Sequence, residues 1–150
     1  MPVIVVGADT PLGHGVLAAL SSGGGEVRAF VTDPSAGARL RAAGIRVALG
    51  DVSDGSHLAG AAVGCYSAVL LAEAAIDGRE RSFASDGDEV LAAWAAALGE
   101  AGVTRAIWVG TAPPGEPATP EVAVVETGGR SPADIAAAVV EIDDGRSLPR

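Results

Sequence analysis

Short apolar segments alternate with helix-like segments along most of the chain, and this alternation constrains the fold more than any other feature. The predicted strands are residues 3–6, 26–32, 45–50, 66–72 and 105–110, each a short apolar run bounded by turn residues. Four helical segments separate them. Five strands alternating with four helices predict an α/β fold, a doubly wound parallel sheet with right-handed crossovers and helices on both faces.

The last part of the chain adds one more strand and helix to this prediction. Residues 112–120 contain four prolines and are expected to form a loop. Residues 121–126 favour a sixth strand, and residues 131–145 a helix capped by Ser131 with Pro132 at its first position. We therefore expect one domain over residues 1–150, with core units in 1–111, a proline-rich loop in 112–120 and a final strand and helix in 121–145.

Composition excludes several classes of partner and location. The net charge of −9 argues against a nucleic-acid or anionic membrane partner. No apolar run reaches the length of a membrane span and no leader precedes residue 3, so we expect a cytoplasmic protein. The single cysteine, Cys65, cannot form an intrachain disulfide and is expected to serve packing.

The turn after the first strand has the outline of a dinucleotide cradle. Gly7 and Gly13 stand where such a turn needs a tight bend and close helix packing, but Thr10 replaces the middle glycine. Thr10 is a good N-cap, and Pro11 suits the first helical position while removing one N–H donor. The sequence therefore predicts weakened phosphate binding at this turn.

Residues 2–111 resemble the NmrA-like and NAD(P)H-binding branch of atypical short-chain dehydrogenase/reductase proteins. The matching stretches are VIVVGADTPLGHGVLAAL, EVRAFVTDPSAGARLRAAGIRVALGDVSD, YSAVLLA and AGVTRAIWVGTA, in the family's order and spacing. The resemblance implies a Rossmann-like fold and NAD or NADP as cofactor.

The resemblance also assigns positions to the cofactor. It places the amides of Leu12 and Gly13 at the pyrophosphate, Asp51 and Val52 beside the adenine, and Leu71 and Ala72 on the nicotinamide side. The alternative for Asp51 is a purely structural role, as a turn or cap that leads into the next helix, and the same alternative applies to Asp54.

Cofactor choice should be encoded at the end of the second strand, where an acid binds ribose hydroxyls or an arginine binds the 2'-phosphate. Val31 occupies the acid position, and Thr32 replaces the arginine of the NADP-preferring branch. Asp33, 20 residues beyond Gly13, is a candidate for a ribose contact, although DPS is equally typical of a helix start.

No catalytic residue is predicted. The resemblance implies a tyrosine followed four residues later by lysine, but Tyr66 is the only tyrosine and the chain has no lysine. Thr111 stands near the expected serine and has no visible proton partner. His14 and His57 are expected to serve packing or the surface, and no metal site is predicted. A solvated face is expected for the acids between the fourth strand and the next helix, namely Glu73, Asp77, Glu80, Asp86, Asp88 and Glu89.

The helix over residues 90–98 is apolar on every side, with Trp94 in its middle. Because a surface helix shows only one apolar stripe, this pattern predicts a homodimer through this helix. The alternative is burial within the monomer under the C-terminal segment.

These observations favour a short, non-catalytic or degenerate NAD(P)-binding relative of the NmrA-like proteins, with a redox-cofactor sensor as one role. Since 39 residues follow Thr111, we expect a relative that lacks the usual substrate region. The alternatives are an NAD(P)-dependent reductase or epimerase, and a structural dimeric module that binds no nucleotide.

Overall fold

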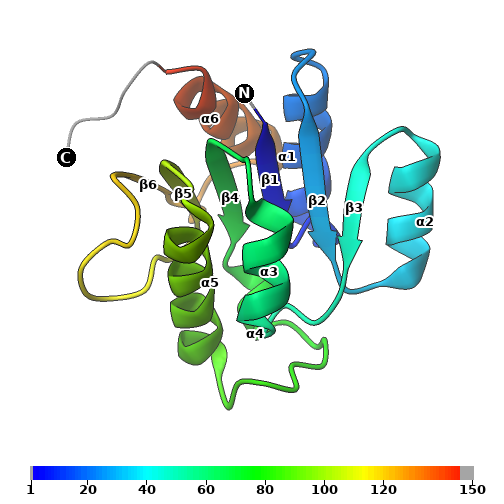
Figure 1. Cartoon of the computed structure of the whole chain (residues 1–150). Coiled ribbons are helices and arrows are strands. Elements are labelled where there is room, and N and C mark those ends of the chain that lie inside the picture. Colours follow the sequence, from blue (N-terminus) through cyan, green and yellow to red (C-terminus); the bar gives the residue numbers. More distant parts are fainter. Residues whose placement is uncertain (1, 146–150) are drawn as a thin grey trace.

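Six parallel strands form one open sheet in the computed structural model, which describes residues 2–145 (Figure 1). The strand order is β3-β2-β1-β4-β5-β6, so the chain starts in the middle and reverses direction across the sheet after β3. This confirms the predicted doubly wound parallel sheet. Residue 1 and residues 146–150, which the domain prediction includes, lie outside the described residues. The strands are β1 Val3–Val6, β2 Val27–Val31, β3 Arg46–Leu49, β4 Ser67–Leu71, β5 Arg105–Val109 and β6 Glu121–Val125.

The helices begin at the residues that the sequence marks as caps. Thr10, Asp33 and Ser131 each accept a hydrogen bond from a backbone N–H of the first turn that they precede, and proline follows each of them. The helices are α1 Pro11–Ser21, α2 Pro34–Ala42, α3 Gly55–Ala62, α4 Glu73–Ile76, α5 Gly87–Ala101 and α6 Pro132–Asp144. The short helix α4 was not predicted, because its four residues are too few to show a helical period.

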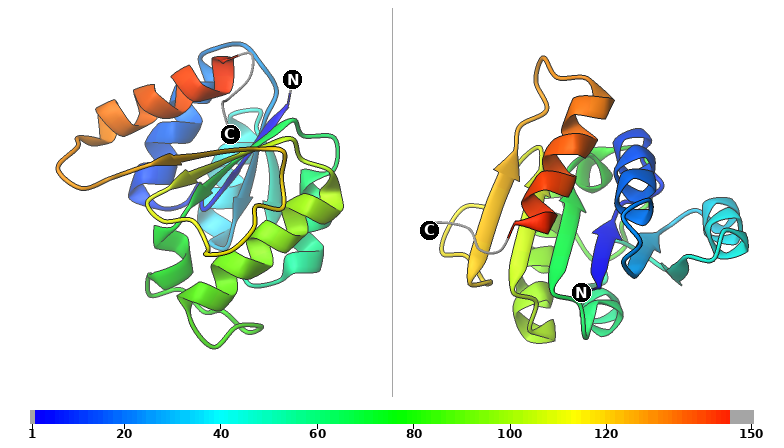
Figure 2. Two further views of the ribbon diagram at one scale, coloured as in Figure 1. Left: turned by 90° about the vertical axis from the view of Figure 1, so that its left-hand side faces the viewer. Right: turned by 90° about the horizontal axis from the view of Figure 1, so that it is seen from above.

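Two hydrophobic layers sandwich the sheet. Strand side chains alternate between them, so Ile4, Val6 and Leu70 face α3 and α5, whereas Val5 and Val69 face α1 and α6 (Figure 2). The middle strands β1 and β4 are buried on both faces, as their continuous apolar sequences predict. Of the helices described, none is long and apolar enough to cross a membrane.

The Trp94 side chain in the middle of helix α5 is buried within the monomer. It is fully buried, and its Nε1 donates a hydrogen bond of 2.7 Å to the carbonyl oxygen of Val52. Helix α5 packs against α3, whereas the C-terminal helix α6 covers the opposite face of the sheet with α1. Burial within the monomer, the alternative that the sequence left open, therefore holds for Trp94, but α3 rather than the C-terminal helix packs on α5. Ala92 and Ala96 of α5 stay exposed.

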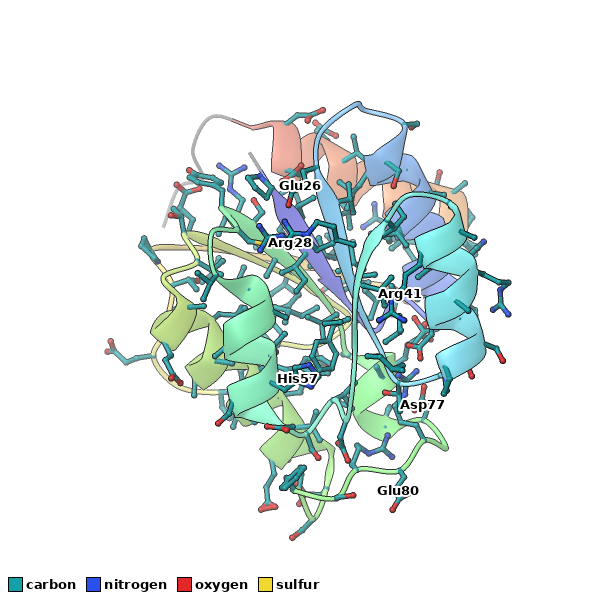
Figure 3. The ribbon with its side chains drawn as sticks, turned by 45° about the vertical axis from the view of Figure 1, so that its right-hand side comes forward. Glu26, Arg28, Arg41, His57, Asp77 and Glu80 are labelled. Atoms are coloured by element: carbon teal, nitrogen blue, oxygen red, sulfur yellow. The ribbon has the colours of Figure 1, made fainter. Side chains whose placement is uncertain are left out.

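The segment between α4 and α5, residues 77–86, crosses the edge of the sheet where the strands have their carboxyl ends (Figure 1). We call this segment the strap. Asp77 and Glu80 both lie on it (Figure 3). Ligands of open α/β sheets bind at this edge, so the strap covers the region where a binding site is expected.

Candidate functional site

All residues predicted to contact a cofactor lie at the carboxyl ends of four neighbouring strands. They follow or end β1, β2, β3 and β4, and the strand order brings these ends together at one edge. The point where the strand order reverses lies between β1 and β4, where open α/β sheets form their binding crevice. The predicted residues are Gly7, Thr10, Leu12, Gly13, Thr32, Asp33, Asp51, Val52, Leu71 and Ala72.

The turn from β1 into α1 keeps the glycine geometry of a dinucleotide cradle. Gly7 has φ of +85°, a conformation that favours glycine, and a Cβ there would lie 2.8 Å from the Cβ of Ala74. A Cβ at Gly13 would collide with the carbonyl oxygen of Gly7. Both glycines therefore allow α1 to begin close against the strand.

Thr10 uses its hydroxyl inside this turn. Its Oγ1 donates to the carbonyl oxygen of Gly7 at 2.8 Å and accepts from the amide of Gly13 at 2.9 Å. The side chain is buried, so it seals the start of α1. The Gly13 amide, one of the two predicted pyrophosphate donors, is thereby already bonded within the chain.

The second predicted donor, the amide of Leu12, points at a carboxylate of the same chain. It donates a hydrogen bond of 3.2 Å to Oε1 of Glu73, the first residue of α4. An anion at the start of α1 is favoured by the free N–H groups and by the helix dipole. Glu73 thus binds the amide that the sequence analysis predicts as a pyrophosphate donor.

Asp9 binds the backbone amides at the end of β2 in the same way as Glu73 binds the amide of Leu12. Its Oδ2 accepts the backbone amides of Thr32 and Asp33, at 2.9 and 3.0 Å. These are the first two residues after β2, where a Rossmann-type site contacts the adenosine ribose or its 2'-phosphate. Asp33 itself caps α2 by accepting the amide of Ser35.

Arg79 of the strap closes over Asp9. Its Nη1 donates to Oδ1 of Asp9 at 2.8 Å and to Oγ1 of Thr32 at 3.2 Å. Its Nε and Nη2 donate to the two oxygens of Asp77, at 2.8 and 2.9 Å. The side chains of Asp9 and Arg79 are 4% and 12% exposed, so this ion pair is poorly accessible to solvent.

Asp51, the predicted adenine contact, fastens the other end of the strap. One carboxylate oxygen accepts the amide and hydroxyl of Ser53, and the other accepts the amide of Ser82 at 2.8 Å. The hydroxyl of Ser53 also accepts the amide of Phe83. Val52 is fully buried, and its carbonyl oxygen accepts from Trp94. Asp54 caps α3, which is the structural role given above as its alternative.

Hydrogen bonds keep the carboxylates of this network ionised. Burial raises the pKa of Asp9, but the hydrogen bonds from Arg79, Asp33 and Thr32 together outweigh burial, so its pKa lies below the ordinary value. The pKa of Asp51 is lowered in the same way, with burial opposed by Ser53 and Ser82. For Asp77, burial is opposed chiefly by Arg79, and its pKa is also lowered.

The ends of β4 and β5 offer little reactive chemistry. Leu71 is fully buried, and Ala72 is partly buried beside Gly110, where an added Cβ would lie 3.2 Å from the Cβ of Ala72. Thr111 is exposed after Gly110. Of these groups, only the hydroxyl of Thr111 could exchange a proton with a ligand.

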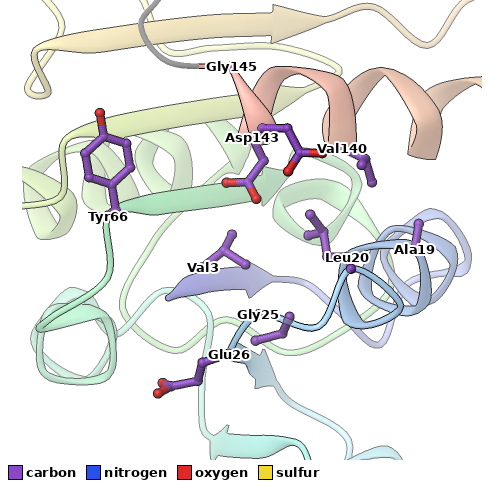
Figure 4. Close-up of a pocket in the computed structure, with 12 residues that line it drawn as sticks. Val3, Ala19, Leu20, Gly25, Glu26, Tyr66, Val140, Asp143 and Gly145 are labelled. Carbon is purple, nitrogen blue, oxygen red and sulfur yellow. The ribbon is translucent and has the colours of Figure 1, made fainter. Parts of the chain in front are cut away.

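Tyr66 lies at the opposite edge of the sheet. It precedes β4, and its hydroxyl donates to Oε2 of Glu121 at 3.3 Å while Arg105 lies over its ring. A cavity of about 430 Å³ opens at this edge between the ends of α1 and α6, lined in part by Tyr66, Glu26 and Asp143 (Figure 4). The only tyrosine is therefore a full strand length away from the predicted cofactor edge.

The cysteine and the two histidines lie as the sequence predicts, whereas the acidic set does so only in part. Cys65 is buried, His14 is exposed and His57 packs edge-on against Phe30. The expectation of a solvated acidic face was wrong for Glu73 and Asp77, which are partly buried and bind within the chain. It holds for the exposed members, Glu80, Asp86, Asp88 and Glu89. Within residues 2–145, no group of three or more His, Cys, Asp or Glu side chains is arranged to hold a metal.

Sequence reasoning missed three participants, Asp9, Glu73 and Arg79. Asp9 stands inside the glycine turn, where a glycine pattern says nothing about the residues between the glycines. Glu73 and Arg79 are 61 and 70 residues away from the groups they bind, Leu12 and Asp9. No local pattern carries such contacts.

Comparison with known families agrees with this geometry. Residues 7–127 match the family model described as NAD(P)H-binding. No match was found among curated proteins.

Solved structures share the fold at low sequence identity. ChuY, an anaerobillin reductase from Escherichia coli O157:H7, is 16% identical with a TM-score of 0.74, over 98% of this chain and 92% of ChuY. Triphenylmethane reductase from Citrobacter sp., solved with NADP(H), is 22% identical with a TM-score of 0.60, over 73% of this chain and 37% of the reductase. The NADPH complex of the quinone oxidoreductase QOR2 from Escherichia coli is 24% identical with a TM-score of 0.58, over 71% and 36%. The chain thus spans well under half the length of the last two enzymes.

Proposed function

Because the chain belongs to the NAD(P)H-binding family and its cofactor class is NAD or NADP, we propose that it is a non-catalytic dinucleotide-binding protein that senses the cofactor in the cytoplasm. Two observations carry this proposal. The amide that should receive the pyrophosphate is held by Glu73, and no tyrosine or lysine lies at the cofactor edge of residues 2–145.

The glycine turn fits a dinucleotide, but the donors around it fit only after the strap moves. The pyrophosphate would replace the Glu73 carboxylate at the Leu12 amide, since two anions cannot share one donor. Glu73 begins α4, which leads directly into the strap. Cofactor binding is therefore coupled to a shift of α4 and the strap, and this coupling gives a sensor two states.

The residues that would hold the cofactor keep the roles that the resemblance implies, with one change. Leu12 would donate to the pyrophosphate and Asp51 would orient the adenine after releasing Ser82. Gly13 would contribute close approach rather than a donor, since its amide bonds to Thr10. A bound nicotinamide ring supplies hydride chemistry, but here Leu71, Ala72 and Thr111 offer it no acid-base pair.

The test is calorimetric titration of the purified chain with NAD, NADH, NADP, NADPH and ADP-ribose up to millimolar concentrations. We expect saturable binding of at least one, without oxidation of NADH or NADPH when carbonyl or quinone substrates are added. Absence of heat with every ligand, for a chain shown to be folded by its thermal transition, would refute the proposal and favour a structural module.

A second candidate is an NAD(P)-dependent reductase, and one observation favours it. ChuY is named as a reductase and matches this chain over nearly its whole length. In that case hydride transfer would depend on positioning and on a water molecule as the proton source. Steady consumption of NADPH or NADH, at 340 nm, with any substrate of the reductases named above would support this candidate over the sensor.

A further inference from the structure

The end of β2 carries a carboxylate that comes from another strand. The sequence lacks the acid or arginine that normally reads the adenosine ribose from β2, since Val31 and Thr32 stand there. Asp9, from the turn after β1, holds the amides of Thr32 and Asp33 instead. Its carboxylate therefore lies where a β2 acid would place its own.

We propose that Asp9 selects NAD(H) over NADP(H), its carboxylate binding the unphosphorylated ribose and repelling a 2'-phosphate. This inference rests on the proposed dinucleotide binding and names the specificity of that same site. Three contacts fix Asp9 in place, the two amides through Oδ2 and Arg79 through Oδ1. When the strap moves away with Arg79, Oδ1 becomes free to accept a ribose hydroxyl, while Oδ2 stays on the backbone.

The charges around Asp9 also disfavour a phosphate. Carboxylates outnumber guanidinium groups at these strand ends and on the strap. The acids are Asp9, Asp33, Asp51, Asp54, Glu73, Asp77, Glu80 and Asp86, and the arginines are Arg79 and Arg81. An added 2'-phosphate would meet a negative field, and the amides that could bind it are already held by Asp9.

Arg79 is the cation that could instead bind the 2'-phosphate, but four of its five guanidinium N–H donors already have acceptors within the chain. Nη1 is shared between Asp9 and Thr32, and Nε and Nη2 bind Asp77. To bind this guanidinium, a phosphate would have to displace the carboxylates of Asp9 and Asp77. The geometry therefore makes Arg79 the partner that holds Asp9 covered.

The test compares the dissociation constants of NADH and NADPH for the wild type, Asp9→Asn and Asp77→Asn. We expect the wild type to bind NADH about tenfold or more tightly than NADPH, and Asp9→Asn to bring the two constants together. Asp77→Asn is the matched control, because it also removes a carboxylate that binds Arg79 but leaves the Asp9 carboxylate at the end of β2. It should strengthen the binding of both ligands by loosening the strap, and it should change their ratio less than Asp9→Asn does, because the Asp9 carboxylate remains at the end of β2.

The outcomes separate this inference from the proposed function. Tighter binding of NADPH than of NADH by the wild type, or an unchanged ratio in folded Asp9→Asn, overturns the role of Asp9 alone. Failure of every dinucleotide to bind the wild type and Asp77→Asn overturns the proposed function itself. If Asp9→Asn does not fold, the wild type titrated with ADP-ribose and 2'-phospho-ADP-ribose decides, since equal affinities would contradict the repulsion.

Discussion

Removing the Glu73 carboxylate should increase the affinity for dinucleotides. Glu73 competes with the pyrophosphate for the Leu12 amide through a hydrogen bond of 3.2 Å, in a partly buried position. A hydrogen bond of this kind contributes about 1 kcal/mol. A displaced carboxylate about 5 Å from a phosphate repels it by about 3 kcal/mol at a dielectric constant of about 20, and by less than about 1 kcal/mol in water.

The two terms can be separated by two substitutions. Glu73→Gln keeps an acceptor for the Leu12 amide but removes the repulsion, which we take as about 1 kcal/mol at this partly buried site, or about fivefold in affinity. Glu73→Ala removes both terms, about 2 kcal/mol, and should bind NADH about 30-fold more tightly than the wild type. Isothermal titration calorimetry measures both ratios.

The control for this experiment is Glu80→Gln on the strap. Glu80 is exposed and has no hydrogen-bond partner among residues 2–145, so the same loss of charge there should change the affinity less than about twofold. A folded Glu73→Ala protein that binds NADH no more tightly than the wild type would show that Glu73 does not occupy the pyrophosphate position. Equal gains in Glu73→Gln and Glu80→Gln would reduce the effect to net charge.

Three further predictions concern stability and assembly. The folded-state pKa values of Asp9, Asp51 and Asp77 lie below the ordinary 3.8, so their stabilisation is present above about pH 4 and is lost as the pH falls through the lowered values. The midpoint temperature of thermal unfolding should therefore decrease as the pH is lowered below about 4, and it should decrease less steeply in Asp9→Asn. Equal slopes of midpoint temperature against pH in the two proteins would contradict this. Trp94→Phe leaves the Val52 carbonyl without its donor and opens a cavity, and should lower the free energy of unfolding by about 2 to 4 kcal/mol in urea denaturation; a loss under about 1 kcal/mol would argue against that role. We also expect a homodimer through the exposed alanine face of α5, and light scattering at micromolar concentration that gives a monomer mass would exclude it.

The sheet and most helix starts could be predicted because their causes are local. Four or five consecutive apolar residues suffice for a buried parallel strand, and Thr10 with Pro11, or Ser131 with Pro132, states where a helix begins. The predicted site residues lie together because the resemblance placed them at the ends of parallel strands, which share one edge of the sheet.

The state of that site could not be predicted, because its causes are distant along the chain. From the sequence, Asp9 is only a turn residue, whereas in the structure it binds Arg79, which is 70 residues away. The sequence likewise indicates a free amide at Leu12, whereas in the structure this amide donates to Glu73. Trp94 shows the same limit, since an apolar helix has the same sequence whether a partner or its own α3 covers it.

The strap also sets the concentration at which such a protein would respond. When only a fraction of molecules has the strap displaced, the apparent dissociation constant rises by the inverse of that fraction, about tenfold for each 1.4 kcal/mol that favours closure. The bonds from Arg79, Ser82 and Phe83 to the sheet edge contribute to that closure energy. Single substitutions among these residues would shift the response threshold along the scale of cellular cofactor concentration without altering any group that touches the ligand.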